Sequence, residues 1–501
     1  MSLFVGRDAE LSDLEGFYSR RGAQFVVVWG RRRVGKTELC ARFAAGKPAA
    51  YHLCRRVSLA EGPRALAREF AKASGVPPPE VEGWAEAIAW VAQSLRARGR
   101  KPLVILDEFP YLIEGDRAVL SEMQKAWDLR LSKEDMMLVL TGSSVGMMET
   151  HVLGYRSPLY GRRTGQVRVG PLPFVALKDF YPRWNPEDLV RAFAVLGGIP
   201  AYLEKFDPER GLMANIRERI LDRSEFLYEE PEIMLRQELR EPARYSDILE
   251  CVAGGSTRMS EISSVTGIPI SNLPKYLRVL SGLGVLERRF PVTERRPRAR
   301  TTAYHVSDHF MRFWFAFVAP SRSLVEGGEA STVVEGIRER MDAFVGPAFE
   351  DIAREHLLRL SNAGKLPVHL ARLGRWWQGE REVDLVGVDT GGREAVFFEV
   401  KWSDLKEREC AALIARLEGV AAEVPVRAAV RRFGVVARSV EGKAALRRAG
   451  FLAFDLEDIL NAPRGRSLGR GRSSSGARRP GGEGEARRPA HRSFPRQGLK
   501  E

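Results

Sequence analysis

The sequence has few cysteines and no long apolar segment. Its four cysteines, at positions 40, 54, 251 and 410, show no C-x-x-C spacing, so we expect buried thiols in a reducing compartment. A run of about 18 apolar residues, which a membrane-spanning helix needs, is absent. Arg7 and Asp8 come too early for the apolar region of a signal peptide. We therefore expect a cytoplasmic protein without a membrane partner.

Basic charge is concentrated at the C-terminal end. The 501 residues are 44% hydrophobic and 29% charged, which is typical of a globular protein of two to four domains. Of the net charge of +14, residues 462–501 carry +8, from 11 Lys or Arg and 3 Glu. This segment is rich in Gly, Ser, Pro and Arg, so we expect it to be disordered. Loose contact with nucleic acid and a purely solubilising role both remain open.

A phosphate-binding loop is predicted near the N-terminus. Residues 30–37 match G-x-x-x-x-G-K-[ST] and lie between an apolar strand, 25–29, and a helix, 37–45. In such a loop, Lys36 reaches the β- and γ-phosphates and Thr37 offers its hydroxyl to Mg²⁺. We therefore expect ATP and Mg²⁺ as ligands, and a basic turn bracketed by glycines is the alternative. The expected nucleotide contacts here are Gly30, Arg31, Arg32, Arg33, Val34, Gly35, Lys36, Thr37 and Glu38.

The segments that follow alternate apolar runs with helical patterns. Expected strands at 49–53, 102–106 and 136–141 indicate a parallel sheet covered by helices, an α/β fold. Asp107 and Glu108 end the second of these strands at the sheet edge that faces the nucleotide. Asp107 would hold Mg²⁺, and Glu108 would orient and deprotonate the attacking water. A solvated strand end is the alternative.

Three further polar side chains are candidates for the same reaction. Ser143 follows the third strand and would touch the γ-phosphate or the water, although a loop-capping role is also compatible. Arg162 and Arg163 would stabilise transition-state charge, in cis or across a contact in a homo-oligomer. A plain basic turn is the other interpretation of these two arginines.

Together these motifs resemble the prokaryotic archaeal-type ATPases, which belong to the STAND and AAA-related P-loop class. The resemblance covers residues 1 to 410. It is carried by Phe4-Val5-Gly6-Arg7-Asp8-Ala9-Glu10-Leu11, the P-loop, Ile105-Leu106-Asp107-Glu108, Thr141-Gly142-Ser143-Ser144 and Gly197-Gly198-Ile199-Pro200. It implies that Val5, Gly6 and Arg7 lie near the adenine base. It also implies that Pro200 belongs to a small helical lid.

The middle of the chain predicts a winged helix. Three short helices, 244–253, 258–266 and 271–283, precede a wing at 284–290 that returns through 295–304. The side chains expected to face DNA are Asn272, Lys275 and Arg278 on the third helix and Arg288 and Arg289 on the wing, together with Arg295, Arg296, Arg298 and Arg300. Such a basic strip favours a DNA backbone. An internal lid is the alternative, because winged helices in P-loop switch proteins also serve that role.

Two histidines stand four residues apart just after the wing. This spacing, His305 and His309, is one that a metal uses. The aromatic residues that follow at helical spacing, from Phe310 to Phe317, favour a buried aromatic helix instead.

The C-terminal region places carboxylates on two paired strands. Strand 381–388 puts Asp384 on the same face as Glu382, and the returning strand 395–402 puts Glu399 beside Lys401. Asp384 and Glu399 would hold Mg²⁺ and Lys401 would help to activate water, as phosphodiester cleavage requires. Charge alternation on an amphipathic strand is the alternative.

This pattern resembles the PD-(D/E)xK nuclease superfamily. The resemblance implies that Glu350, in an expected helix at 343–359, supplies the acid of the first helix. No proline precedes Asp384, which departs from the motif of that superfamily.

We predict an α/β protein of five parts. They are a P-loop ATPase domain at 1–175, a helical lid at 176–235, a winged helix at 236–320, a restriction-endonuclease-like domain at 321–461 and the basic tail at 462–501. ATP hydrolysis would drive action on DNA, with Mg²⁺-dependent cleavage at the C-terminal site. The alternative is a nucleotide-controlled regulatory or scaffolding switch whose C-terminal domain binds without cutting.

Overall fold

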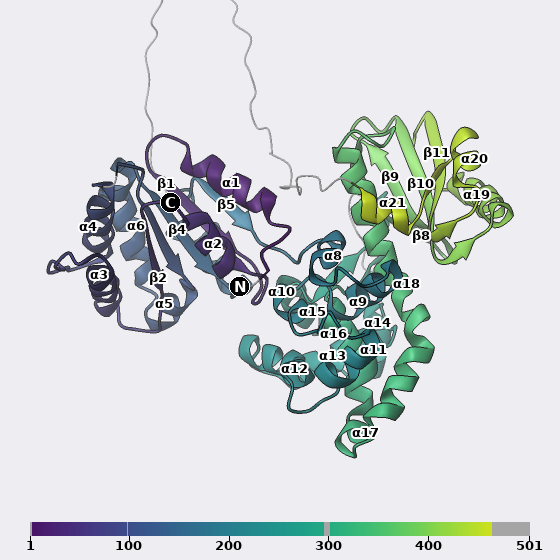
Figure 1. Ribbon diagram of the computed structural model, residues 1–501, viewed down its shortest axis with the longest axis horizontal. Coiled ribbons are helices and arrows are strands. Elements are labelled where there is room, and N and C mark those ends of the chain that lie inside the picture. The colour runs from purple at the N-terminus through teal and green to yellow at the C-terminus, as the bar shows by residue number, and fades with distance from the viewer. Residues whose placement is uncertain (1–2, 98, 295–300, 463–501) are drawn as a thin grey trace, which may run out of the picture. The chain divides into compact units, whose positions relative to one another are not determined.

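The computed structural model describes residues 3–97, 99–294 and 301–462 (Figure 1). They belong to one compact unit of the chain. The predicted tail beyond residue 462 lies outside the described residues, as do Arg295, Arg296, Arg298 and Arg300. Within the described ranges, no helix combines the length and apolar character needed to span a bilayer.

The N-terminal sheet has five parallel strands in the order β2-β3-β4-β1-β5. Their bounds are β1 Gln24–Trp29, β2 Ala49–Leu53, β3 Leu103–Asp107, β4 Met137–Gly142 and β5 Gly165–Arg168. Every residue of β1, β3 and β4 is buried, as expected for a parallel sheet with both faces covered. The predicted parallel α/β sheet is therefore confirmed, and β5 is an additional strand.

Helices cover both faces of this sheet (Figure 1). Val26 and Val28 of β1 share one core with Leu39 and Phe43 of α2, whereas Phe25 on the same strand packs in the opposite core. This alternation follows from the two-residue period of a strand. The helices are α1 Asp8–Tyr18, α2 Lys36–Ala44, α3 Glu61–Ser74, α4 Trp84–Arg96, α5 Pro110–Gly115 and α6 Val119–Leu129.

A helical segment follows the sheet. Its helices are α8 Leu177–Phe180, α9 Pro186–Leu196, α10 Pro200–Leu203, α11 Leu212–Asn215 and α12 Phe226–Glu238. Gly197 ends α9 with a φ of 65°, and a Cβ on Gly198 would lie 1.9 Å from the carbonyl oxygen of Leu172. Only glycine fits this close approach, which brings Pro200 to the cavity beside the P-loop.

Three helices and a hairpin come next, in the element order expected of a winged helix. The helices are α13 Pro242–Ala253, α14 Met259–Thr266 and α15 Leu273–Gly282, and the antiparallel strands are β6 Leu286–Arg289 and β7 Ala303–Val306. Leu273, Leu277 and Leu280 of α15 are buried. After β7, α16 His309–Phe313 begins the predicted aromatic helix, in which Phe310 and Trp314 are buried.

The C-terminal region consists of one long helix and a mixed five-stranded sheet. The sheet order is β12-β11-β10-β9-β8, with antiparallel pairs from β8 to β10 and parallel pairs from β10 to β12. The elements are α18 Ala330–Asn362, β8 Leu370–Gln378, β9 Arg381–Asp389, β10 Glu394–Leu405, α19 Glu407–Ala421, β11 Val430–Val440, α20 Lys443–Arg448, β12 Leu452–Phe454 and α21 Leu456–Asn461. The predicted hairpin is confirmed as β9 and β10.

Helix α18 is longer than the predicted helix at 343–359. It begins at Ala330, because Val333, Val334, Ile337 and Met341 recur at helical spacing and are all buried. This early part of the helix carries Asp342, whereas Glu350 lies further along the same helix.

Candidate functional site

A cavity of about 440 Å³ lies where the strand ends of the parallel sheet meet the P-loop. Predicted residues that line it are Val5, Arg7, Arg32, Arg33, Val34, Gly35, Lys36, Thr37, Glu38, Glu108, Ser143 and Pro200. Leu3, Phe4, Tyr111, Leu172, Ala201 and Glu204 complete the lining. The predicted contacts Gly6, Gly30 and Arg31 lie outside this lining.

The P-loop has the conformation that its glycines require. Gly35 caps α2 with a φ of 87°, and a Cβ on Gly30 would lie 2.1 Å from the carbonyl oxygen of Val169. The ammonium of Lys36 donates to the carbonyl oxygen of Arg31 at 3.0 Å. Burial lowers the pKa of Lys36, and Glu108 and Asp107 oppose this shift. The ammonium of Lys36 therefore lies against the loop, within the electrostatic influence of Asp107 and Glu108.

Asp107 lies at the end of β3 and is almost fully buried. One carboxylate oxygen, Oδ2, accepts from Thr37 Oγ1 at 3.0 Å and from the hydroxyl of Tyr51. The other, Oδ1, accepts from the backbone nitrogen of Glu108 at 3.1 Å and from the hydroxyl of Thr141. Burial, and then the bond to Asp107, raise the pKa of Tyr51, so its hydroxyl remains a donor.

Tyr51 is a contact of this site that the sequence analysis missed. It lies on β2, whose neighbour in the sheet is β3, the strand that ends at Asp107. Only the strand order brings the two side chains together. The only signal in the sequence was a hydroxyl-bearing side chain, Tyr51, within a short strand that precedes the strand ending at Asp107.

Glu108 has a φ of 56°, which is uncommon for a residue other than glycine. One of its carboxylate oxygens accepts from the backbone nitrogen of Ser143 at 3.0 Å and from the hydroxyl of Ser143 at 2.8 Å. Ser143 therefore orients the acid beside the cavity. This contact differs from the predicted ones, which were with the phosphate or the water.

Arg7 braces the P-loop. Its guanidinium donates to the carbonyl oxygens of Val34 and Gly170, each at 2.7 Å, and pairs with Glu10 at 2.9 Å. The side chain is 4% exposed. These contacts tie the N-terminal segment to the loop that shapes the cavity.

The three arginines of the P-loop form ion pairs with the helical regions that follow the sheet. Arg31 pairs with Asp308 and Arg33 with Glu230. Arg32 pairs with Glu238 at 3.2 Å. These three arginines, at positions that the P-loop motif leaves unspecified, thus contact α12 and the start of α16.

Arg162 and Arg163 are engaged away from the cavity. Arg162 binds both carboxylate oxygens of Asp128, at 2.8 to 3.0 Å. Arg163 donates to the carbonyl oxygen of Leu153 at 3.0 Å. Because neither lines the cavity of its own chain, charge stabilisation by these arginines would require a subunit contact.

The residues predicted to contact DNA divide into two groups. Asn272 at the N-cap of α15, Lys275 and Arg278 on α15 and Arg288 on β6 are exposed. Arg289 points the other way, as the two-residue period requires, and pairs with Asp351 of α18 at 3.1 Å. Its guanidinium is therefore engaged within the chain.

The four residues predicted for the C-terminal site converge. Lys401 lies 2.9 Å from Glu399 and 3.7 Å from Asp384. Arg375 of β8 lies 3.2 Å from Glu350 and 3.5 Å from Asp384. Arg375 was missed, as was Arg416 of α19, which pairs with Glu399 at 2.5 Å.

The carboxylates of this cluster are buried and balanced by cations. Asp384 and Glu399 are 5% and 4% exposed. Burial raises the pKa of Glu350 to about 7, with Asp384 adding to the shift and Arg375 opposing it. Across the described ranges, no three His, Cys, Asp or Glu side chains are grouped so that they could hold a metal ion. Cations of the chain itself, not a preformed all-acid cage, neutralise these acids.

The fold and the first site define a class of protein. A parallel sheet, a glycine loop with Lys36 and Thr37, and the pair Asp107 and Glu108 at the neighbouring strand end are the parts of a P-loop ATPase. Residues 4–206 match the family model of an ATPase domain predominantly from Archaea. Residues 314–413 match a model of archaeal and bacterial proteins of unknown function.

One relative matches most of this chain. The chain is 34% identical over 407 residues to an uncharacterized protein of Methanocaldococcus jannaschii, covering 81% of this chain and 89% of that protein. A shorter match, 42% identical over 45 residues, is to an uncharacterized ATP-binding protein of the same organism and covers 9% of this chain and 76% of that protein. The chain therefore belongs to the archaeal-type P-loop ATPase family.

The matches among solved structures have lower sequence identity. The Walker-type ATPase of Pyrococcus abyssi is 22% identical and matches with a TM-score of 0.46, covering 62% of this chain and 95% of that one. The ORC2 protein of Aeropyrum pernix is 15% identical with a TM-score of 0.40, covering 68% of this chain and 96% of that one.

Proposed function

We propose that this chain binds ATP with Mg²⁺ in the cavity beside the P-loop and hydrolyses it. The observation that carries the proposal is the arrangement of Lys36, Thr37 and Glu108 around one cavity. Lys36 lines this cavity and would neutralise the β- and γ-phosphates of the bound nucleotide. The amide groups at the start of α2 add the positive end of the helix dipole.

The residues present fit a magnesium ion. Thr37 Oγ1 and Asp107 Oδ2 lie 3.0 Å apart, so a hydroxyl and a carboxylate adjoin the phosphate loop. Mg²⁺ prefers such oxygen ligands and keeps several waters. Thr37 would hold the ion directly and Asp107 through water, and the ion would supply charge neutralisation on the phosphates.

Glu108 is the proposed general base. The two hydrogen bonds from Ser143 fix its carboxylate at the wall of the cavity. There it can orient the attacking water and accept its proton. Since the carboxylate is already positioned, little reorganisation is required when water and nucleotide bind.

Calorimetry tests the binding step. Folded protein should take up ADP and ATP in the presence of Mg²⁺, with weaker uptake when the metal is chelated. A folded protein that takes up neither nucleotide contradicts the proposal.

Mg²⁺-dependent DNA cleavage by residues 321–461 is a second proposed function. It is favoured by the convergence of Asp384, Glu399 and Lys401, with Glu350 joined to them through Arg375. Asp384 and Glu399 offer the oxygen donors that Mg²⁺ prefers. The ion pairs of Glu399 with Lys401 and Arg416 would have to open when a cation binds.

A plasmid-nicking assay tests this second function. Supercoiled DNA is incubated with Mg²⁺, with and without ATP, and with wild type or Asp384→Ala. The matched control is Glu382→Ala, which changes an acid on the same strand whose side chain is 60% exposed. We expect nicking by wild type and the control and none by Asp384→Ala. Equal results for all three favour the alternative, a regulatory or scaffolding switch whose C-terminal domain binds without cutting.

DNA contact through residues 236–320 is proposed on the exposed basic residues of α15 and β6. Lys275, Arg278 and Arg288 would bind phosphates, and Asn272 is exposed at the N-cap of α15. Phosphate contacts release counterions, so replacing the three cations by alanine should weaken DNA binding and flatten its salt dependence. Unchanged salt dependence would favour the internal-lid role.

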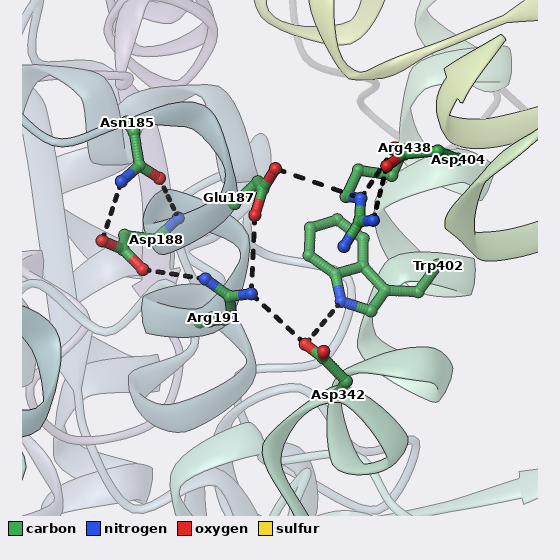
Figure 2. Close-up of polar contacts among 8 residues, drawn as sticks. All are labelled: Asn185, Glu187, Asp188, Arg191, Asp342, Trp402, Asp404 and Arg438. Carbon is green, nitrogen blue, oxygen red and sulfur yellow. Dashed lines mark hydrogen bonds and ion pairs between the residues drawn. The ribbon is translucent and has the colours of Figure 1, made fainter. Parts of the chain in front are cut away.

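Coupling between the two sites is proposed through α9 and α18 (Figure 2). Arg191 of α9 pairs with Asp342 of α18 at 3.3 Å, and Asp342 also accepts from the indole nitrogen of Trp402 on β10 at 3.1 Å. Helix α9 leads through the Gly197 and Gly198 turn to Pro200 at the nucleotide cavity. A movement of residues 176–235 on nucleotide binding would thus reach the helix that carries Glu350.

A further inference from the structure

Asp107 has every hydrogen-bonding position of its carboxylate filled. Oδ1 accepts from the backbone nitrogen of Glu108 and the hydroxyl of Thr141. Oδ2 accepts from the hydroxyls of Thr37 and Tyr51. An ionised carboxylate offers about four lone-pair sites. A magnesium-bound water can therefore reach Asp107 only when one of these four donors moves away.

Three of the four donors are held in place. Glu108 donates through its backbone nitrogen, which the course of the chain fixes. Thr141 is fully buried, so its hydroxyl is held by the surrounding side chains. Thr37 can donate its proton to Asp107 while a lone pair of the same oxygen faces the cation, so it need not leave. Tyr51 is 39% exposed and lies on β2, an edge strand of the sheet. It is the donor with room to move.

We propose that Tyr51 is a positioning residue of the nucleotide site. Its hydroxyl occupies the lone-pair position of Asp107 that would otherwise accept a hydrogen bond from a magnesium-bound water. The hydroxyl is displaced when the cation and nucleotide bind. This inference rests on the proposed Mg²⁺-dependent nucleotide binding. Before the metal arrives, Tyr51 keeps Asp107 oriented, and the cation must compete with it for the carboxylate.

The first test measures how much Mg²⁺ is needed for ADP binding. Tyr51→Phe keeps the ring and removes the hydroxyl. Calorimetry of ADP binding at increasing Mg²⁺ should give a half-maximal concentration about fivefold lower than in wild type, since one net hydrogen bond no longer opposes the cation. ADP affinity in EDTA should be unchanged. The control Tyr160→Phe removes a hydroxyl from a tyrosine of similar exposure, 43%, and should keep the wild-type midpoint.

A second readout separates displacement from a merely structural role. In EDTA, Tyr51→Phe should melt at a lower temperature than wild type, because a hydrogen bond to a buried carboxylate is lost. With saturating Mg²⁺ and ADP the difference should disappear, because Tyr51 has then left Asp107 in wild type as well. A structural hydrogen bond would keep the difference under both conditions.

The outcomes distinguish this inference from the function on which it rests. An unchanged or higher Mg²⁺ midpoint in Tyr51→Phe, alongside Mg²⁺-dependent ADP binding by wild type, overturns the role of Tyr51 alone. A melting difference that persists with Mg²⁺ and ADP does the same. If wild type itself binds ADP without regard to Mg²⁺, the proposed metal-dependent site fails, and the role of Tyr51 fails with it.

Discussion

Ser143 holds one carboxylate oxygen of Glu108 with two hydrogen bonds, from its backbone nitrogen at 3.0 Å and its hydroxyl at 2.8 Å. Glu108 follows β3 and Ser143 follows β4, the neighbouring strand. The left-handed backbone at Glu108, with a φ of 56°, turns its side chain toward that neighbour. Strain of this kind persists where the surrounding structure holds it, commonly at functional sites.

Replacing Glu108 by Gln should separate binding from turnover. The amide keeps the size of the side chain but cannot accept the proton of the attacking water. We expect kcat for ATP to fall about 100-fold or more, with the Kd for ATP within about twofold of wild type because the phosphate contacts remain. Steady-state hydrolysis and calorimetry measure the two quantities. Retained hydrolysis would remove Glu108 from the role of base.

Ser143→Ala should have a smaller effect on the same step. The backbone hydrogen bond to Glu108 remains and only the hydroxyl bond is lost. Since a hydrogen bond to a charged group contributes about 1.5 kcal/mol or more, we expect kcat to fall about tenfold at unchanged ATP affinity. Ser144→Ala, the same change one residue along, is the control and should retain the wild-type kcat. Equal kcat values for both variants would count against positioning by Ser143.

Lys36→Ala should abolish tight nucleotide binding. Lys36 is 5% exposed, lines the cavity and is the ammonium of the P-loop. Its loss removes a cation from the expected phosphate site, and we expect ATP affinity to fall about 100-fold. Lys125→Ala removes an exposed lysine of α6 and serves as the control. Thermal unfolding of both variants without nucleotide would establish that the loss is one of binding. Wild-type affinity in Lys36→Ala would refute the assignment.

Local patterns in the sequence were sufficient for the P-loop, for β1 to β4 and for the convergence of Asp384, Glu399 and Lys401. Each depends on a motif or on the two-residue period of paired strands, which is encoded within a few residues. Tyr51 and Arg375 could not be placed in this way. Tyr51 reaches Asp107 because β2 neighbours β3, and Arg375 reaches Asp384 because β8 forms the edge beside β9. Such strand neighbours are fixed only by the complete fold.

From the sequence alone, we also counted as available for ligands arginine side chains that form ion pairs within the chain. Arg289 was predicted to face DNA, yet it pairs with Asp351, a residue 62 positions away. Arg162 was predicted to stabilise transition-state charge, in cis or across a subunit contact, and within its own chain it binds Asp128 of α6. A sequence lists charged side chains but not their partners, because ion pairs join segments that are distant along the chain.

Buried histidines predict that the protein loses stability in mild acid. Burial lowers the pKa of His309 to about 4, as do the neighbouring Arg312 and Arg289, and burial likewise lowers the pKa of His356 to about 4 with a contribution from Arg359. In the unfolded chain a histidine has a pKa of about 6.5. The unfolded state therefore binds protons first, so stability is complete above about pH 6.5 and is lost as the pH falls toward 4.

His356→Leu tests this window. The ring of His356 is 1% exposed and packs against Phe454, so leucine removes the titrating group and keeps an apolar contact. At pH 5 each such histidine should cost about 1 to 2 kcal/mol relative to pH 7. The free energy of unfolding, measured by denaturant titration at both pH values, should therefore fall less in the variant than in wild type. An equal fall in both proteins would show that other groups cause the acid sensitivity, whatever the variant's stability at pH 7.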